Sequence, residues 1–368
     1  MIAKQPIELP LQRILAATRT HWDRPEIRSA VRENFEKMLI CRTPALGAEV
    51  YASQNEEKLV YHTCKSPVCP SCGHRATQLW QREQWAALPD IPYAGVVLTM
   101  PNVLWPIFRQ NRHLLHDLPA LGAAAIQEWA KVKYGTRVLI MAVQHTFGRH
   151  LNFHPHLHLL VSAGGLQESE GRWIARLEFD KGEIMEMWRF AVIAYLWRAL
   201  HAEVLTSSID SEKLRVVLRA QYKRQWNIHI DPFKSKLQFL RYAGRYIRRP
   251  PISQSRFVSV TDAEVHFRTK DLKKKQVVVT QYSTKTFVSL LAEHVRDRYQ
   301  HAMRYFGLLA PGSKHQTTAA LFALLGQERR SRPRRLSWRN SLRKAFGKDP
   351  LLDSCGQPMH WARRVKPV

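Results

Sequence analysis

The chain of 368 residues carries 57 lysines and arginines against 30 aspartates and glutamates, a formal net charge of +27. It lacks the roughly 20 consecutive apolar residues of a membrane-spanning helix and an apolar signal-peptide core in its first 30 residues. A disordered chain is excluded, because 45% of the residues are hydrophobic and 11 are tryptophan. We therefore expect a soluble, cytoplasmic protein of two or three domains.

The N-terminal part contains two predicted helices with cysteines between them. Apolar residues at helical spacing predict helices from Pro25 to Arg42 and from Ala76 to Leu88. Three of the five cysteines, Cys64, Cys69 and Cys72, fall within nine positions. An odd number of cysteines does not make a disulfide framework, so this spacing indicates a metal site in a reducing compartment.

Three thiolates leave a tetrahedral zinc site one ligand short. The residues that could complete it are Cys41, His62 and His74. In the predicted zinc site we therefore place Cys41 with Cys64, Cys69 and Cys72. The alternative is a set of buried reduced thiols in a domain without metal.

Strands dominate the next part of the chain. Apolar, β-branched runs predict buried strands at 93–101, 137–147 and 154–165, the last two joined by a short connection. Helical segments are predicted at 103–133, with interruptions near Pro106 and Pro119, and from Ile184 to Glu203.

The C-terminal half mixes both kinds of element. Residues 236–249 read as a helix that Pro250 and Pro251 stop, a second helix is expected from about Thr286 to Tyr305, and a loosely ordered basic arm follows from Gly312. Mixed elements with hairpins predict an α+β fold with an antiparallel sheet. The strand-like runs are 214–222, 225–233, a hairpin of 257–262 with 263–271, and 275–282.

The positive charge is concentrated in this half. Residues 211–368 carry 34 basic and 10 acidic side chains, whereas 1–90 and 91–210 have net charges of +2 and +1. Because basic residues alternate with aromatic ones around 241–249, the pattern is typical of a folded nucleic-acid-binding surface. The alternative is a solvated, solubilising face.

Histidines alternate with apolar residues in the run HPHLHLLV, residues 154–161. Side chains of a strand alternate between its faces, so His156 and His158 share one face and Leu157 lies on the other. Two imidazoles on one face, with His154 two positions earlier, indicate a divalent metal site, for zinc or, with an oxygen ligand, for Mg²⁺ or Mn²⁺. A lone histidine on an apolar strand would more often be a hydrogen-bonded core residue.

Two tyrosines, Tyr242 and Tyr246, lie four residues apart in the helix predicted at 236–249. This spacing places both hydroxyls on one face, next to Arg245 and Arg249. A phenol with a pKa of about 10 is a poor nucleophile alone, but beside a metal-bound phosphate and guanidinium groups it can attack phosphorus. The alternative is an amphipathic helix with half-buried tyrosines.

Together these features resemble the HUH superfamily of rolling-circle nucleases, and more narrowly the bacterial two-tyrosine transposases of insertion-sequence family ninety-one. The histidine and tyrosine segments are the specific ones, and the others support them. The segments are CRTPALG (41–47), HTCKSPVCPSCGHRATQLW (62–80), VVLTMP (96–101), QHTFGRHLNFHPHLHLLVSAGG (144–165), RYAGRYIRRPPIS (241–253) and MRYFGLLAP (303–311).

The resemblance implies an antiparallel-sheet HUH nuclease core flanked by helices. It divides the chain into a small helical, zinc-knuckle, DNA-binding domain at 1–90, a catalytic domain at 91–310 and a basic tail at 311–368. Similar transposases carry a further CxxC pair upstream in the zinc domain, but residues 51–56 contain no cysteine here. In the tail, Leu352 stands where the family has the first cysteine of a CxxC pair, which leaves Cys355 alone.

The resemblance also implies roles for single residues. His156 and His158 would bind the catalytic metal ion, and Tyr242 and Tyr246 would be the nucleophiles. Gln144 is the first choice for a third metal ligand, because family members keep a glutamine there. His145 and His154 remain alternatives, and the arginines expected to contact DNA are Arg241, Arg245, Arg248 and Arg249.

The implied reaction is cleavage and rejoining of single-stranded DNA. A tyrosine attacks the phosphodiester, forming a 5′-phosphotyrosine and freeing a 3′-hydroxyl, while Mg²⁺ or Mn²⁺ orients the phosphate. Residues 307–314 do not form the phosphate-binding loop of an NTPase, so a helicase would come from the host. We expect a nucleoid-associated protein; the alternatives are a replication initiator or relaxase of the same superfamily and a non-catalytic DNA-binding protein.

Overall fold

A five-stranded antiparallel sheet lies at the centre of the structure, a computed structural model that describes residues 9–246, 249–271, 274–312 and 314–368. The strands follow the order β12-β4-β5-β3-β8, so β4 and β5, consecutive in the chain, are neighbours in the sheet. The fold is α+β with an antiparallel sheet, as the sequence predicts. The strands are β3 (Tyr93–Leu98), β4 (Leu139–Phe147), β5 (Phe153–Ser162), β8 (Ile228–Phe233) and β12 (Met303–Gly307).

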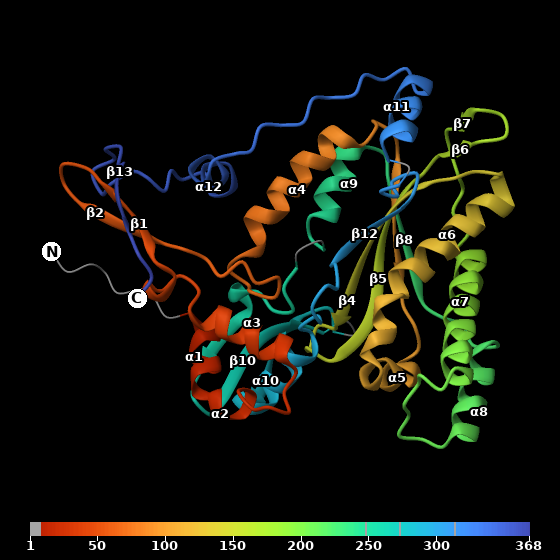
Figure 1. Ribbon diagram of the computed structural model, residues 1–368, viewed down its shortest axis with the longest axis horizontal. Helices are drawn as coiled ribbons and strands as arrows, with labels where there is room; N and C mark the ends of the chain where they lie inside the picture. Colours follow the sequence, from red (N-terminus) through yellow and green to blue (C-terminus); the bar gives the residue numbers. More distant parts are fainter. Residues whose placement is uncertain (1–8, 247–248, 272–273, 313) are drawn as a thin grey trace.

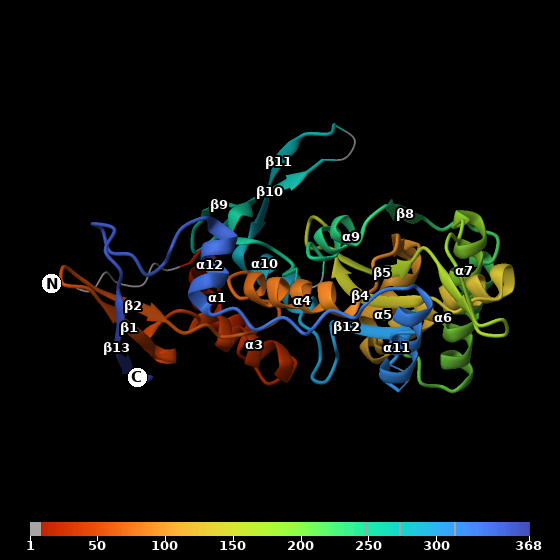
Figure 2. The same cartoon turned by 90° about the horizontal axis from the view of Figure 1, so that it is seen from above.

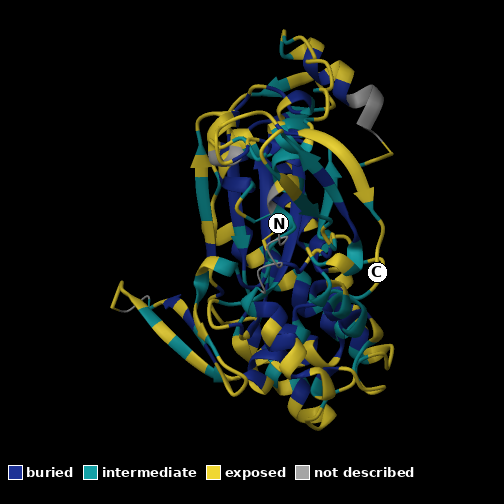
Figure 3. Cartoon of the chain, turned by 90° about the vertical axis from the view of Figure 1, so that its left-hand side faces the viewer, coloured by how far each residue is buried: buried dark blue, intermediate teal, exposed yellow. Residues whose placement is uncertain are grey.

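Helices cover both faces of this sheet, because its central strands carry apolar side chains on both faces (Figure 1). On one face, Leu159 and Val161 pack into a core shared with α6 and α7. On the other face, Leu160 packs with α9, against which α4 also lies. Figure 3 shows the buried residues concentrated along the central sheet. These helices are α4 (Gly73–Ala87), α5 (Trp105–Gln110), α6 (Leu118–Tyr134), α7 (Lys181–His201), α8 (Ser211–Gln221) and α9 (Lys236–Ala243).

A second hydrophobic core combines residues from the N-terminal helices with residues from the later part of the chain. N-terminal helices pack against α10 and a three-stranded sheet of order β11-β10-β9. Residues before and after position 90 both belong to this core. The domain boundary at residue 90 stays a prediction. Its elements are α1 (Pro10–Ala17), α2 (Arg19–Trp22), α3 (Ser29–Leu39), α10 (Thr284–Glu293), β9 (Phe257–Val260), β10 (Glu264–Lys270) and β11 (Val277–Ser283).

The C-terminal tail is ordered along α4, which corrects the expected loose arm (Figure 1). Arg330 Nη2 lies 2.7 Å from Asp90 Oδ2, and Ser341 donates a 2.6 Å hydrogen bond to Gln78. The last strand then pairs with β1 in a sheet of order β13-β1-β2. These elements are β1 (Ala48–Ala52), β2 (Glu57–Tyr61), α11 (Lys314–Leu324), α12 (Trp338–Phe346) and β13 (His360–Val365).

Three further predictions of single elements are wrong. All but the last of residues 214–222 belong to helix α8, because Asp210 caps its first turn and Leu214 and Leu218 pack one turn apart. The helix expected to reach Arg249 ends at Ala243, where hydrogen bonds to the third preceding residue tighten the chain. The helix expected to reach Tyr305 ends at Glu293, and β12 follows.

The remaining elements are short. The segment expected to be helical with interruptions at 103–133 consists of η2 (Asn102–Leu104), α5, η3 (Arg112–His116) and α6. No helix in the described part of the chain combines the length and the apolarity that a membrane crossing needs. The others are η1 (Pro44–Leu46), η4 (Gln254–Arg256) and the hairpin of β6 (Gly165–Gln167) with β7 (Arg172–Ile174).

Candidate active site

Three histidines meet on one face of the two central strands. The register of β4 and β5 pairs His145 with His156, and Val143 with His158, so all three imidazoles share a face. The ring centroids of His145 lie 5.5 Å from those of His156 and 4.9 Å from those of His158. One nitrogen from each ring lies within 4.8 Å of the others. A single divalent ion can therefore contact all three rings.

Hydrogen bonds orient two of these rings. His156 Nδ1 lies 2.8 Å from the carbonyl oxygen of His154, and His145 Nε2 lies 2.8 Å from that of Tyr246. Each nitrogen donates there, because a carbonyl only accepts, and the other nitrogen of each ring keeps its lone pair. His158 Nδ1 is buried without a hydrogen-bond partner among the described residues. A buried polar atom without a partner is costly, and a bound cation would supply one.

Burial keeps the three imidazoles neutral. It lowers the pKa of His156 to about 4 and that of His158 to about 2, in both cases helped by the neighbouring histidines. The pKa of His145 is also lowered well below its ordinary value, chiefly by burial. Neutral imidazole is the form that binds metal ions, so the site is ready for a cation at neutral pH.

Gln144, the first choice for a third ligand, lies on the opposite face of the sheet. The register pairs it with Leu157, whose side chain belongs to the core beside α5 and α6. Its side chain is buried and its Nε2 has no hydrogen-bond partner among the described residues. The geometry therefore favours His145, one residue along the same strand, over Gln144. His154 also lines the cleft, with its ring 4.8 Å from that of His156 and 4.7 Å from that of Trp105.

The two predicted tyrosines occupy different surroundings. Tyr246 is half-buried just beyond α9, and its ring stacks on His158 with centroids 4.0 Å apart. Tyr242 is buried on α9 against β3 and β8, and its ring lies 4.8 Å from that of Tyr246. Burial, followed by the charges of Tyr246 and Asp231, raises the pKa of Tyr242 well above that of a free phenol. The guanidinium carbon of Arg245 lies 5.1 Å from the Tyr242 ring and 5.9 Å from the Tyr246 ring.

The histidines open into a cleft of about 690 Å³ with a basic lining. Tyr246 and Arg249 line it on one side, and the turn between β4 and β5 and the β10–β11 hairpin line it on the other. Sequence analysis missed the cations Arg149, Arg256 and Lys270, because only the folded chain brings their separate segments to the histidines. For Arg256 and Lys270 the one available signal was the high density of basic residues after residue 211, and Arg149 lies outside that segment.

The arginines predicted to contact DNA do not form one cluster. Arg249 lines the histidine cleft, and Arg245 lies over the tyrosine rings. Arg241 lines a separate hollow between α4, α9 and the tail, together with Arg82 and Lys344. Arg248 lies outside the described residues.

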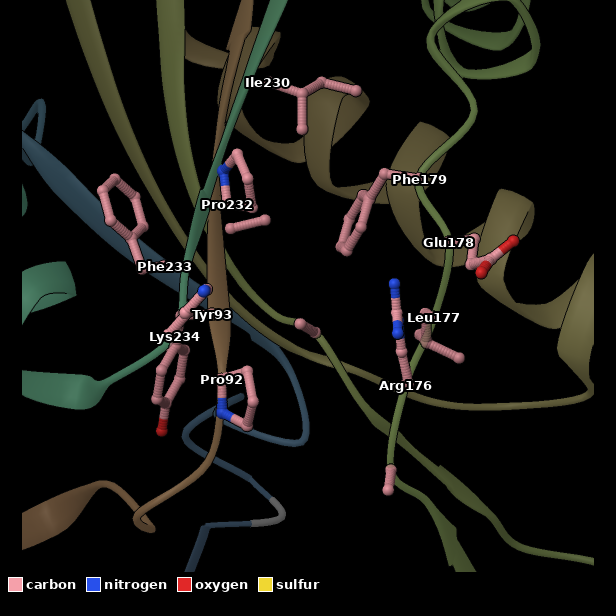
Figure 4. Close-up of a pocket in the computed structure, with 13 residues that line it drawn as sticks. Pro92, Tyr93, Arg176, Leu177, Glu178, Phe179, Ile230, Pro232, Phe233 and Lys234 are labelled. Carbon is pink, nitrogen blue, oxygen red and sulfur yellow. The ribbon is translucent and has the colours of Figure 1, made fainter.

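A larger hollow, of about 840 Å³, lies at the edge of the central sheet beside β3 and β8 (Figure 4). Its walls are mainly apolar and include Phe179 and Pro232, and its cations are Arg176 and Lys234. No histidine or cysteine is among the residues that line it. The metal-binding chemistry therefore belongs to the smaller cleft.

A four-cysteine cluster forms a second candidate metal centre. Cys41 follows α3, Cys64 and Cys69 lie in the loop after β2, and Cys72 precedes α4. The Sγ atoms of Cys41 and Cys72 are 3.7 Å apart, those of Cys64 and Cys72 3.6 Å, and those of Cys69 and Cys41 3.8 Å. Zinc–sulfur bonds of about 2.3 Å in a tetrahedron place sulfurs about 3.8 Å apart, so the four thiols fit a zinc ion.

The fourth zinc ligand in this geometry is Cys41. His62 instead contacts the carbonyl of Leu46 and the carboxylate of Glu49, and the side chain of His74 lies outside the described residues. Hydrogen bonds from neighbouring thiols, chiefly that of Cys41, lower the pKa of Cys72. The cluster therefore favours the thiolate form of Cys72. Cys355 is exposed and stands outside the cluster.

Known proteins match both parts of the chain. The family described as "Transposase zinc-binding domain" matches residues 12–100, and the family described as "Putative transposase" matches residues 140–317. These ranges contain the four cysteines and the histidine cleft with both tyrosines, respectively.

Two curated relatives are similar over most of the chain. The "Transposase for insertion sequence element IS801" of Pseudomonas savastanoi pv. phaseolicola is 35% identical over 295 residues, which are 77% of this chain and 71% of that protein. "Putative transposase y4qJ" of Sinorhizobium fredii is 31% identical over 323 residues, which are 82% of this chain and 79% of that protein.

Proposed function

Because this chain belongs to the IS91 family of insertion-sequence transposases, we propose that it cleaves and rejoins single-stranded DNA through a covalent tyrosine–phosphate intermediate at the three-histidine cleft. The observation that carries the proposal is the contact of Tyr246 with His158, which brings a phenol to three neutral imidazoles. The four-cysteine cluster accounts separately for the zinc-binding domain.

His145, His156 and His158 would hold the divalent ion of the cleft. When bound, the ion would polarise the scissile phosphate and stabilise the charge that develops on it. Imidazoles suit Mn²⁺ better than Mg²⁺, because Mg²⁺ prefers oxygen ligands throughout. We therefore propose Mn²⁺ as the more effective of the two ions at this site.

Tyr246 is the proposed nucleophile of the first cleavage. Its phenolic oxygen attacks phosphorus as the proton leaves, the bond from phosphorus to the 3′ oxygen breaks, and that oxygen takes up a proton. Arg249, exposed in the same cleft, and Arg245 above the ring supply positive charge for the phosphate. The phosphotyrosine keeps the energy of the cleaved phosphodiester bond. Attack by a 3′-hydroxyl can therefore restore a DNA strand without ATP.

Tyr242 is the proposed second nucleophile. Its buried hydroxyl and raised pKa oppose its reaction in the present arrangement. Its ring lies 4.8 Å from that of Tyr246, so a shift of the chain beyond α9 that moves Tyr246 away would open Tyr242 to the cleft. Two tyrosines would serve two cleavages, one at the element and one at the target. We propose that residues 1–90 bind zinc and DNA and that residues 91–310 catalyse the reaction. Residues 311–368 would make further contacts with DNA.

The test is a covalent adduct between the protein and labelled single-stranded DNA from an end of the element, incubated with Mn²⁺ and denatured before electrophoresis. We expect an adduct with the natural chain and with the control Tyr222→Phe, whose ring lies next to Phe190 beside α8. The double variant Tyr242→Phe with Tyr246→Phe is expected to form none while it still binds the DNA. A non-catalytic DNA-binding protein would form no adduct in any sample. Nicking without joining to a second strand would favour a replication initiator or relaxase.

A further inference from the structure

We propose that the hairpin of β10 and β11 binds duplex DNA in its major groove, immediately beside the single strand in the histidine cleft. The inference deepens the proposed function and rests on it, because it names a duplex partner for the same site. It predicts that the preferred substrate is a junction between single-stranded and double-stranded DNA.

The outer part of the hairpin projects from the body of the protein as a two-stranded ribbon, beyond the point where β9 also pairs with β10, at Phe267. The two strands pair from Glu264 with Ser283 to Lys270 with Val277. The part formed by two strands alone has three residues in each, 268–270 and 277–279, and is about 10 Å long before its turn. Figure 2 shows it rising from the molecule on the same side as α9. A two-stranded ribbon fits the major groove of B-DNA, which is about 12 Å wide.

The outer part of the ribbon has the chemistry of a groove-binding surface. Lys270, Lys274 and Lys275 are exposed there and can contact phosphates on both sides of a groove. Val277 is 66% exposed and Val279 is 56% exposed, although β-branched residues in a strand usually pack against a neighbour. In a major groove these side chains would meet the methyl groups and edges of bases.

Charge varies along the ribbon in a way that orients the DNA. The end nearest the body carries acidic residues: Asp262 pairs with Arg13, and Glu264 contacts His266 and Gln281. The lysines lie at the other end, together with one acidic residue, Asp271. The duplex would therefore contact the outer part of the ribbon and avoid its acidic base.

The side chains favour a duplex over a single strand as the occupant. Proteins that grip single strands usually stack bases on exposed aromatic rings. Among the described residues 264–271 and 274–283, the exposed positions hold lysine, arginine, valine and polar residues but no aromatic ring. Phe267 is buried, and Tyr282 donates its hydroxyl to the carbonyl of His150. Aromatic rings instead gather in the histidine cleft.

The ribbon is fixed to the strands that carry the histidines. Tyr282 and Thr280 hydrogen-bond to His150, in the turn between β4 and β5, at 2.9 and 3.3 Å. Arg256 connects the same turn to β10, donating to the carbonyls of Arg149 at 2.6 Å and Arg268 at 2.9 Å. Lys270 and Val278 also line the cleft. A duplex on the ribbon would thus be held at a fixed distance from the scissile phosphate.

The experiment compares two probes that share one labelled strand from an element end: the strand alone, and the strand annealed on one side to form more than one turn of duplex. Fluorescence anisotropy measures the affinity of the full chain for both across a salt series. The test variant is Lys274→Ala with Lys275→Ala. The matched control is Lys213→Ala with Lys223→Ala, because both lysines are exposed at α8.

We expect the natural chain and the control to bind the junction more tightly than the single strand. The test variant is expected to lose about tenfold in junction affinity, with the salt slope reduced by about two, and to keep its single-strand affinity. A second variant, Val277→Ser with Val279→Ser, is expected to weaken junction binding without changing the salt slope. Unchanged junction binding in both variants, or an equal loss on both probes, overturns the inference.

The adduct assay separates this inference from the proposed function. If the single strand forms a covalent adduct while the hairpin variants bind the junction normally, the hairpin inference fails and the proposed function stands. If the variants lose junction binding as expected but no adduct forms on either probe, the hairpin binds DNA and the covalent chemistry is refuted.

Discussion

The ring of Tyr246 stacks on the ring of His158, with centroids 4.0 Å apart and planes inclined by 27°. The backbone of Tyr246 makes a second link, since its carbonyl accepts a hydrogen bond from His145 Nε2. One residue beyond α9 thus contacts two of the three histidines. This arrangement couples the position of a candidate nucleophile to the orientation of the candidate metal ligands. A substitution of either should therefore change the position of the other.

Replacing His145 is expected to weaken metal binding more than replacing its neighbour Gln144. His145→Ala removes one of three ring nitrogens and should lower the affinity for Mn²⁺ by about tenfold to a hundredfold. Gln144→Ala should leave the affinity within about twofold, because its side chain lies on the other face of the sheet. Titration of Mn²⁺ followed by electron paramagnetic resonance measures both values. A larger loss with Gln144→Ala would restore the glutamine as the third ligand.

Gln144→Leu is expected to leave stability unchanged or to raise it by about 1 kcal/mol. The natural amide is buried, and its Nε2 has no hydrogen-bond partner in the part of the chain that the structure describes. An apolar side chain of similar size removes that unpaired donor. Urea denaturation gives the free energy of unfolding. A loss of more than about 2 kcal/mol would mean that the amide has a polar partner or a ligand that stabilises the fold.

The four-cysteine cluster is expected to bind one zinc ion per chain. Because the ion would be bound only by the folded cluster, Cys41→Ser or a strong chelator should lower the melting temperature. Cys355→Ser is the matched control and should change neither zinc content nor melting temperature, because Cys355 is exposed outside the cluster. Elemental analysis with thermal denaturation decides the matter. Full stability in the absence of zinc would indicate a cluster of reduced thiols.

Gly95→Ala is expected to destabilise the protein by about 1–3 kcal/mol. A Cβ atom at this position on β3 would lie 2.8 Å from Cε1 of Tyr242, whose ring is buried and cannot move aside freely. Gly171→Ala is the control for packing, since no atom of the described residues outside its chain neighbours lies within 4 Å of its added Cβ, although its φ of +61° adds backbone strain. The free energies of unfolding of both variants test the packing of Tyr242 on the sheet. Equal stability would mean that Tyr242 moves away from β3 at little cost.

Local sequence patterns predicted what depends on one strand or one helix. The alternation around His156 and His158 follows from the geometry of a strand. The third histidine depends on which residue of β4 lies opposite them, and a shift of one position exchanges His145 for Gln144. The family likeness favoured the glutamine, whereas the register places the histidine beside the pair. Register is a property of two strands together, so neither segment could show it alone.

Tertiary packing explains the other differences. Val216 and Val217 gave residues 214–222 a strand-like character, but Leu214 and Leu218 pack one turn apart against the core. Cys41 lies 23 residues before Cys64, and only the contact between α3 and the later loop brings their sulfurs together. The basic tail has little apolar sequence signal, and its order depends on pairing with β1 and on contacts along α4.

The most direct test of the central claim is to map the phosphorylated residue in the covalent adduct. After reaction with single-stranded DNA and Mn²⁺, the adduct is digested by nuclease and protease, and mass spectrometry identifies the peptide that carries the nucleotide. Attachment to Tyr246 is the predicted result for the first cleavage, and Tyr246→Phe should abolish it while Tyr242→Phe preserves it. Attachment to Tyr242 alone, or cleavage without any phosphotyrosine, would contradict the account.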